Sequence, residues 1–160
     1  MRFYTIGEYG STEQSFFDKL KENKIDTFCD IRQRRGVRGK KYAYVNSLYL
    51  QKKLKECGIR YLYVPNLAPT SEIRNIQKKT DKKDNISKSN RVQISKDFEL
   101  EYKNKVLSTF DFDSFITNLE TSAAATNAVL FCVEETAEAC HRSIVANALH
   151  LKYNNFIKNL

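Results

Sequence analysis

The sequence predicts an α/β fold, a three-layer domain with about five mostly parallel strands and helices on both faces of the sheet. Short apolar runs rich in β-branched and aromatic residues alternate along the chain with helical patterns. From the N-terminus the order is strand, helix, strand, helix, strand, which is the signature of right-handed βαβ units. The chain of 160 residues is the size of one ordinary domain. We therefore expect a single domain over residues 1–160.

The first half of the chain supplies three strands and two helices. The strands are expected at residues 2–7, 26–31 and 60–64. A first helix begins after Ser11, because Ser11 and Gln14 have the spacing of a capping box. A second helix begins after Asn46 and ends at Gly58, which serves as its C-cap.

The regular alternation stops at residues 67–95. This segment is polar and basic, so we expect a mobile basic insertion with a short helix near 71–79. Regular elements then resume. They are expected to be helices at about 96–108 and 112–122, a strand at 128–133, a helix from Cys140 and a strand at 156–160.

Positive charge is concentrated in two segments of a chain whose formal net charge is +8. Residues 32–41 hold six cations and no acid, and residues 72–96 hold eight cations against three acids. Clustered cations suit a phosphate-bearing partner, since each contact releases a counterion. We expect a nucleotide or nucleic acid; the alternative is a lysine-rich surface that reflects biased codon usage.

Several classes of site and location are not expected. No apolar run approaches the roughly 20 residues of a membrane helix, and the N-terminus lacks a secretion signal, so no membrane partner is expected. The four cysteines have no framework spacing, which favours reduced thiols in a cytoplasm. Phosphate-binding and dinucleotide motifs are missing, so no cofactor is expected. No metal is expected either, because Cys132, Cys140 and His141 have no recognised ligand spacing.

Candidate site residues follow from the geometry of parallel sheets, in which ligands bind outside the carboxyl ends of the strands. Polar side chains stand directly after four of the predicted strands. They are Glu8, Asp30, Arg32, Arg35, Asn66, Cys132, Glu134, Cys140, His141 and Arg142. The helix that begins at Cys140 adds backbone N–H groups and a dipole that favour an anion. We therefore expect an anion pocket at this edge.

Roles can be assigned to these residues from their chemistry. Arg32 and Arg142 are expected to hold the anion, and Arg35, Glu134, Cys132 and Asn66 are further binding candidates. Asp30 or Glu8 is the candidate base, and Cys140 or His141 the candidate nucleophile or acid.

Each candidate also has a structural interpretation. Cys140 fits a buried inert thiol, His141 fits a loop cap, and Arg142 fits a pairing with Glu134 or Asp30. Three functions therefore remain open. The protein is an enzyme or binding protein with an anion pocket, a non-catalytic nucleic-acid-binding module that uses its basic loops and has a structural Cys-His-Arg cluster, or a redox sensor.

Two motifs carry a resemblance to a known family. Phe131-Cys132-Val133-Glu134, followed by Cys140-His141-Arg142-Ser143, resembles the C-x-E…CHR signature of the DUF488 family, small α/β proteins of unknown function. Asp30-Ile31-Arg32 and Gly58-Ile59-Arg60-Tyr61 extend the similarity over most of the chain. Gly7-Glu8-Tyr9 departs from it, because the family usually has Gly-His-Ser there. The resemblance implies the fold and names no reaction.

Overall fold

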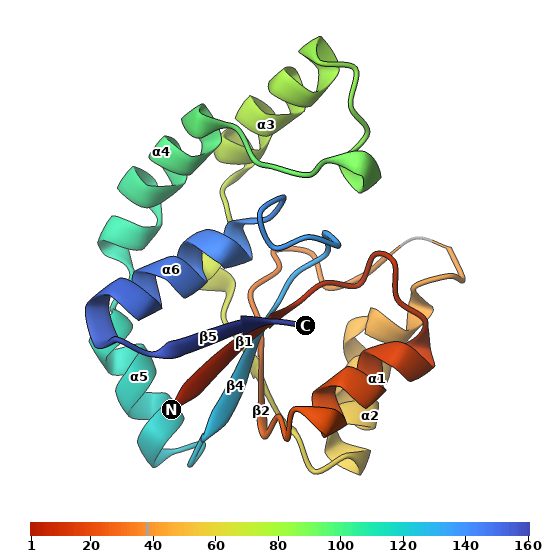
Figure 1. Cartoon of the computed structure of the whole chain (residues 1–160), viewed down its shortest axis with the longest axis vertical. Helices are drawn as coiled ribbons and strands as arrows, with labels where there is room; N and C mark the ends of the chain where they lie inside the picture. Colours follow the sequence, from red (N-terminus) through yellow and green to blue (C-terminus); the bar gives the residue numbers. More distant parts are fainter. Residues whose placement is uncertain (38) are drawn as a thin grey trace.

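A single all-parallel sheet forms the centre of the molecule (Figure 1). The computed structural model describes residues 1–37 and 39–160, and within them five strands are paired in the order β3-β2-β4-β1-β5. The strands are β1 (Arg2–Ile6), β2 (Thr27–Asp30), β3 (Arg60–Tyr63), β4 (Asn127–Phe131) and β5 (Phe156–Asn159). All four pairings are parallel, which confirms the predicted α/β fold.

Six α-helices accompany the sheet in the described residues. They are α1 (Glu13–Glu22), α2 (Ser47–Glu56), α3 (Ser71–Lys83), α4 (Lys96–Lys105), α5 (Phe112–Thr121) and α6 (His141–Tyr153). Helices α1 and α2 cover one face of the sheet and α5 and α6 the other, while α3 projects beyond the sheet (Figure 1). Helix α4 packs against α6, and its Phe98 and Tyr102 belong to the core on that face. None of these helices has the length and apolar character that crossing a bilayer requires.

The three layers follow from the alternation of side chains along the strands. In β4, Ala128 and Leu130 join the core under α4, α5 and α6, whereas Val129 and Phe131 join the core under α1 and α2. Successive strand residues point to opposite faces, so a continuously apolar strand fills both cores. This explains why the predicted strand at 128–133 reads as an unbroken apolar run.

The predicted capping box of the first helix is wrong by one residue. The N-cap is Thr12, whose Oγ1 accepts a hydrogen bond from the backbone N–H of Ser15 at 3.1 Å. Ser15 Oγ accepts in return from the backbone N–H of Thr12 at 3.0 Å. The helix begins at Glu13, so the position that closes the box is Ser15 rather than Gln14. The second helix starts after Asn46 as predicted, and Gly58 follows its C-cap with a φ of 71°.

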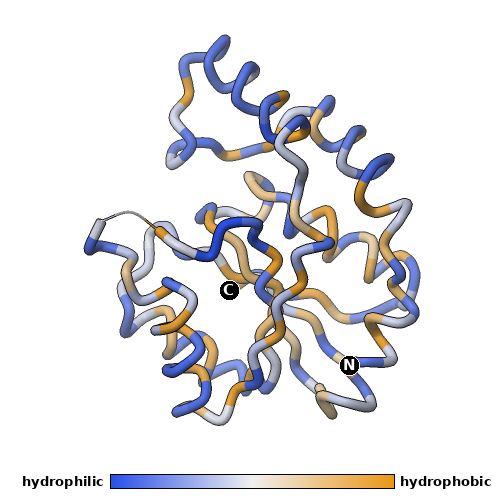
Figure 2. Tube along the Cα trace, turned by 180° about the vertical axis from the view of Figure 1, so that it is seen from behind, coloured by the Kyte–Doolittle hydropathy of each residue, from blue (hydrophilic) through white to orange (hydrophobic). Residues whose placement is uncertain are grey.

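The expected short helix at 71–79 extends to Lys83. Thr70 caps it by accepting from the backbone N–H of Ile73 at 3.3 Å. Residues 84–95 then return toward α4, and the backbone N–H of Ser95 donates to Gln77 Oε1 at 2.8 Å. We call residues 71–95 the arm. Its outer part is largely hydrophilic (Figure 2), and its mobility stays a prediction.

Candidate functional site

The C-terminal edge of the sheet brings several of the predicted residues together. Ile6 of β1 and Asp30 of β2 are both in register with Phe131 of β4, so the segments that follow these strands emerge side by side. The imidazole of His141 connects two of these segments, because its Nε2 lies 3.2 Å from the carbonyl oxygen of Ile31.

A cavity of about 390 Å³ lies between this edge and the arm. Its volume is within the range of small-molecule sites, about 300 to 1,000 Å³. Its cationic lining residues are Arg32, Arg34, Arg74, Lys78, Lys88 and Arg91. Among the described residues that line it, Asp81 and Glu134 are the acids. The cavity therefore has an excess of positive charge.

Part of this positive charge is already neutralised by protein groups. Arg91 bridges two carboxylates, with Nη1 2.8 Å from Asp81 Oδ2 and Nη2 2.7 Å from Glu134 Oε1. Its Nε also donates to the backbone carbonyl of Ala139 at 3.1 Å. Lys88 lies 3.5 Å from the same Glu134 oxygen. Arg91 thus attaches the arm to the loop that follows β4.

Three other cations of the lining have no such partner. Within the part of the chain that the structure describes, Arg34, Arg74 and Lys78 form no ion pair. Burial and the neighbouring positive charge of Arg34 lower the pKa of Arg74. Two guanidinium groups that repel each other at a cavity wall are stabilised when an anion binds between them.

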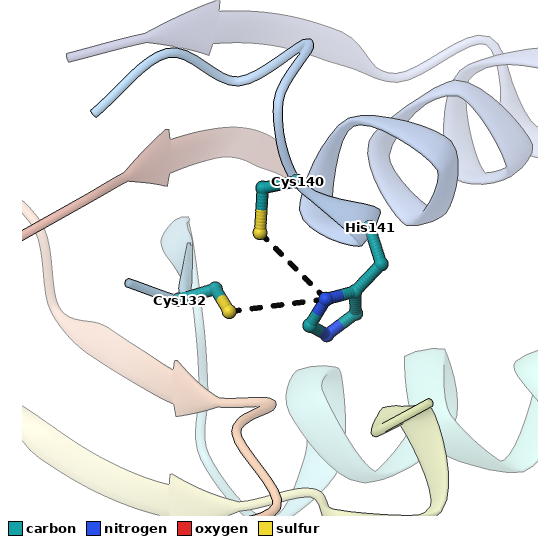
Figure 3. A group of neighbouring side chains, drawn as sticks. All are labelled: Cys132, Cys140 and His141. Carbon is teal, nitrogen blue, oxygen red and sulfur yellow. Dashed lines mark hydrogen bonds between the residues drawn. The ribbon is translucent and has the colours of Figure 1, made fainter. Parts of the chain in front are cut away.

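Two thiols and an imidazole form a cluster (Figure 3), and all three of these residues line the cavity. Cys132 follows β4, Cys140 is the N-cap of α6, and His141 is the first residue of that helix. His141 Nδ1 lies 3.8 Å from Cys132 Sγ and 3.6 Å from Cys140 Sγ. Because the carbonyl of Ile31 can only accept a hydrogen bond, the proton sits on Nε2 and Nδ1 faces the sulfurs.

The environment of the cluster separates the pKa values of its two thiols. Burial raises the pKa of Cys140, but the Cys132 thiol hydrogen bond and the charge of His141 lower it more, leaving it well below its usual range. The pKa of Cys132 is well above its usual range because of its bond to Cys140 and its burial. Burial by itself lowers the pKa of His141, but the negative charge of Cys140 outweighs this effect, so the pKa of His141 is raised.

Asp30 and Arg32 form a buried, doubly hydrogen-bonded pair. Arg32 Nε and Nη2 donate to the two carboxylate oxygens of Asp30, each at 2.9 Å, and the Tyr61 hydroxyl donates to Asp30 at 2.8 Å. Both charged side chains are almost fully buried: that of Arg32 is 2% exposed and that of Asp30 is 0% exposed. Arg32 borders the cavity, whereas Asp30 is not among the described residues that line it.

Glu8 lies on the other side of Arg32. Its Oε2 is 3.6 Å from Arg32 Nη1, and both atoms lack a hydrogen-bond partner within the described part of the protein. Burial raises the pKa of Glu8 to about 7, and the charge of Arg32 opposes this increase. The catalytic roles predicted for Asp30, Glu8, Cys140 and His141 remain predictions.

Arg142 is not among the described residues that line the cavity, and it is 1% exposed. Its Nη1 donates to the backbone carbonyl of Glu134 at 2.6 Å, and its Nη2 donates to that of Glu135 at 2.8 Å. Its Nε lies 3.4 Å from the hydroxyl of Thr5. The partners are neutral, and Glu134 is contacted through its main chain rather than its carboxylate. These contacts support the structural interpretation of Arg142.

Two further candidates lie apart from the cluster. The guanidinium carbon of Arg35 is 4.1 Å from the centre of the Tyr63 ring. Asn66 is exposed in the 3₁₀ turn Pro65–Leu67 and borders a different hollow, next to α5. Arg38, part of the predicted basic segment, lies outside the described residues.

The sequence prediction did not identify the wall that the arm contributes. Arg74, Lys78 and Asp81 line the cavity from one face of α3, at spacings of four and three residues. That spacing places charged residues on one face of a helix, and it is the signal in the sequence that could indicate a binding surface. The same spacing is equally common on a helix that faces only solvent.

Comparison with known proteins identifies one family. The family model described as "Domain of unknown function DUF488" matches residues 12–149. No curated protein and no solved structure matches the chain.

Proposed function

Because the chain belongs to the DUF488 family, which is described only as a domain of unknown function, we propose its function from the geometry of the site. We propose that it binds a phosphate-bearing ligand, a nucleotide or a nucleic-acid phosphate, in the cavity between the strand ends and the arm. The observation that carries this proposal is the group of three lining cations, Arg34, Arg74 and Lys78, without carboxylate partners in the described residues.

Unpaired cations around a concave site bind an anion more strongly than the same cations on a flat surface. The cavity walls exclude part of the water, and the lower effective dielectric strengthens each contact. Arginine contributes two parallel N–H donors that match the geometry of phosphate oxygens. The N-terminus of α6, which begins at His141 beside the cavity, adds a favourable partial positive charge.

Charge-neutralising substitutions on α3 test the proposal. Arg74→Gln and Lys78→Gln remove cations that line the cavity, while Lys79→Gln and Lys82→Gln remove exposed cations that do not line it. Calorimetric titration with inorganic phosphate, a nucleoside triphosphate and a short oligonucleotide gives the affinities. A lost charged hydrogen bond costs about 1.5–3 kcal/mol, so each cavity variant should bind about tenfold more weakly or worse. Equal affinities for all four variants would refute the proposal.

A second candidate function is supported by the exposed lysines of the arm. Lys79, Lys82 and Lys83 lie on α3 outside the cavity lining, and such a surface suits non-specific contact with a nucleic-acid backbone. In that case oligonucleotide affinity would fall steeply with salt and would follow these three lysines. It would be insensitive to Arg74 and Lys78, and inorganic phosphate would not bind measurably.

A further inference from the structure

We propose that Cys132, Cys140 and His141 bind a zinc ion in the wall of the cavity, through the two Sγ atoms and Nδ1. The residues come from two elements, because Cys132 follows β4 while Cys140 and His141 begin α6. Their three ligand atoms all lie within 4.8 Å of one another. Figure 3 shows both sulfurs facing the same ring nitrogen.

The two sulfur–nitrogen separations match those that a tetrahedral zinc ion imposes on its ligands. With Zn–S near 2.3 Å and Zn–N near 2.0–2.1 Å, a sulfur and a nitrogen ligand are separated by about 3.6 Å. The observed separations from His141 Nδ1 are 3.6 Å for Cys140 Sγ and 3.8 Å for Cys132 Sγ. Small side-chain adjustments would therefore suffice for coordination.

The surroundings orient the imidazole as a metal ligand. The Nε2–H of His141 donates to the carbonyl oxygen of Ile31 at an N···O distance of 3.2 Å, which leaves the Nδ1 lone pair directed at the sulfurs. A backbone carbonyl on the second ring nitrogen is the usual support of a zinc-bound histidine. The ring of Tyr102 packs against the imidazole, with 5.5 Å between ring centres, and limits its rotation.

The positive cavity does not prevent a cation from binding at this position. Two thiolate ligands would neutralise the charge of Zn²⁺. The nearby cations Lys88 and Arg91 are paired with Glu134, whose other oxygen, Oε2, lies 3.7 Å from Cys132 Sγ. The negative charges of the two thiolates and of Glu134 would therefore lie next to the metal ion.

Because all three ligands line the cavity, a fourth coordination position of the ion would be open to it. Zinc sites with three protein ligands and one open position accept a water or a substrate oxygen there. A phosphate oxygen would take that position, and this last statement rests on the proposed function. Metal binding itself does not depend on it.

Metal binding can be measured directly on the full chain. The protein is purified without chelator, its metal content is determined, and the apoprotein is titrated anaerobically with Co²⁺ and then with Zn²⁺. We expect one equivalent of Co²⁺ with thiolate charge-transfer bands and the intense visible bands of tetrahedral coordination, displaced by Zn²⁺. Cys140→Ser and His141→Gln should weaken binding at least about tenfold, while Cys57→Ser, which alters a thiol outside the cluster, should leave it unchanged.

A second measurement does not require the variants to fold. Alkylation of the wild-type protein, mapped by mass spectrometry, should become slower at Cys132 and Cys140 when Zn²⁺ is added, with no change at Cys57. The inference is overturned by any of three results: no saturable one-to-one binding, unchanged binding in both ligand variants, or a Cys132–Cys140 disulfide that persists under reducing conditions. Arg74→Gln should retain the metal even if it loses phosphate, so the failure of either proposal can be recognised separately.

Discussion

Gly7 lies directly against the main chain of Glu134. A Cβ atom added to Gly7 would lie 1.9 Å from the carbonyl oxygen of Glu134. The same oxygen accepts the 2.6 Å hydrogen bond from Arg142. The backbone N–H of Glu8 also donates to the carbonyl of Val133 at 3.1 Å. The turn after β1 and the loop after β4 therefore define each other's position, and the cluster depends on both.

Gly7→Ala is expected to destabilise the fold by about 3 kcal/mol or more, because the methyl group would displace a hydrogen-bonded carbonyl rather than a flexible side chain. Urea denaturation measures the loss. Gly36→Ala is the matched control, since its Cβ would meet its nearest atom, Asn46 Oδ1, at 3.8 Å. A Gly7→Ala variant as stable as the control would contradict the close contact.

Arg142→Lys should cost stability while leaving anion affinity nearly unchanged. A lysine cannot reproduce the parallel bonds to the carbonyls of Glu134 and Glu135, so the free energy of unfolding should fall by about 2–4 kcal/mol. Phosphate affinity of the folded variant should change less than about twofold, because Arg142 does not line the cavity. Lys152→Ala removes an exposed cation on the same helix and should change the free energy of unfolding very little. A large loss of affinity would instead support the anion-binding role that the sequence suggests.

Glu8 should make stability depend on pH. Its pKa in the folded protein is about 7, against an ordinary value of 4.5, because burial disfavours the charged form. Both states are protonated below about pH 4.5. As the pH rises toward 7 the unfolded chain loses its proton first, so stability falls, by an amount on the order of 2–3 kcal/mol.

Glu8→Gln removes this ionisation and should flatten the decline in stability between pH 5 and 8. Denaturation curves at several pH values, compared with those of the exposed-site control Glu22→Gln, measure the difference. Parallel profiles for wild type and Glu8→Gln would show that the carboxyl is not protonated in the native state.

Arg91→Ala should loosen the arm more than the rest of the fold. The substitution removes both ion pairs to Asp81 and Glu134 and the bond to the carbonyl of Ala139. We expect backbone amides of α3 to exchange with solvent at least about tenfold faster, with strand amides unaffected. Lys88→Ala, whose side chain is 55% exposed and touches the same Glu134, is the control. Unchanged exchange in the Arg91 variant would show that other contacts hold the arm.

The fold was predictable because its signals are local. The apolar run at 128–133 and the glycine at Gly58 each identify an element without reference to the rest of the chain. Strand order has no such signal, since the pattern of a buried parallel strand is the same at any central position of the sheet. The cap at Thr12 was misplaced because Ser11 and Thr12 are chemically equivalent candidates.

The site was only partly predictable because its geometry depends on a long-range contact. Cys132 and His141 are separated by a loop whose path is set by Arg142 and by the arm, so their spacing matches no local ligand motif. Arg74 and Lys78 were visible only as part of a basic segment. Their position at the cavity follows from how residues 84–95 return, which no periodicity encodes.

The loop between β4 and α6 is held in place by hydrogen bonds to its main-chain carbonyl groups. The carbonyl oxygens of residues 134, 135, 138 and 139 all accept hydrogen bonds from Arg142 or the arm. Such bonds do not depend on the side chains at these positions, and two of them, Glu135 and Glu138, are exposed. Exposed side chains of this loop can therefore be replaced, by evolution or by engineering, without altering the main-chain contacts that hold the cluster in place.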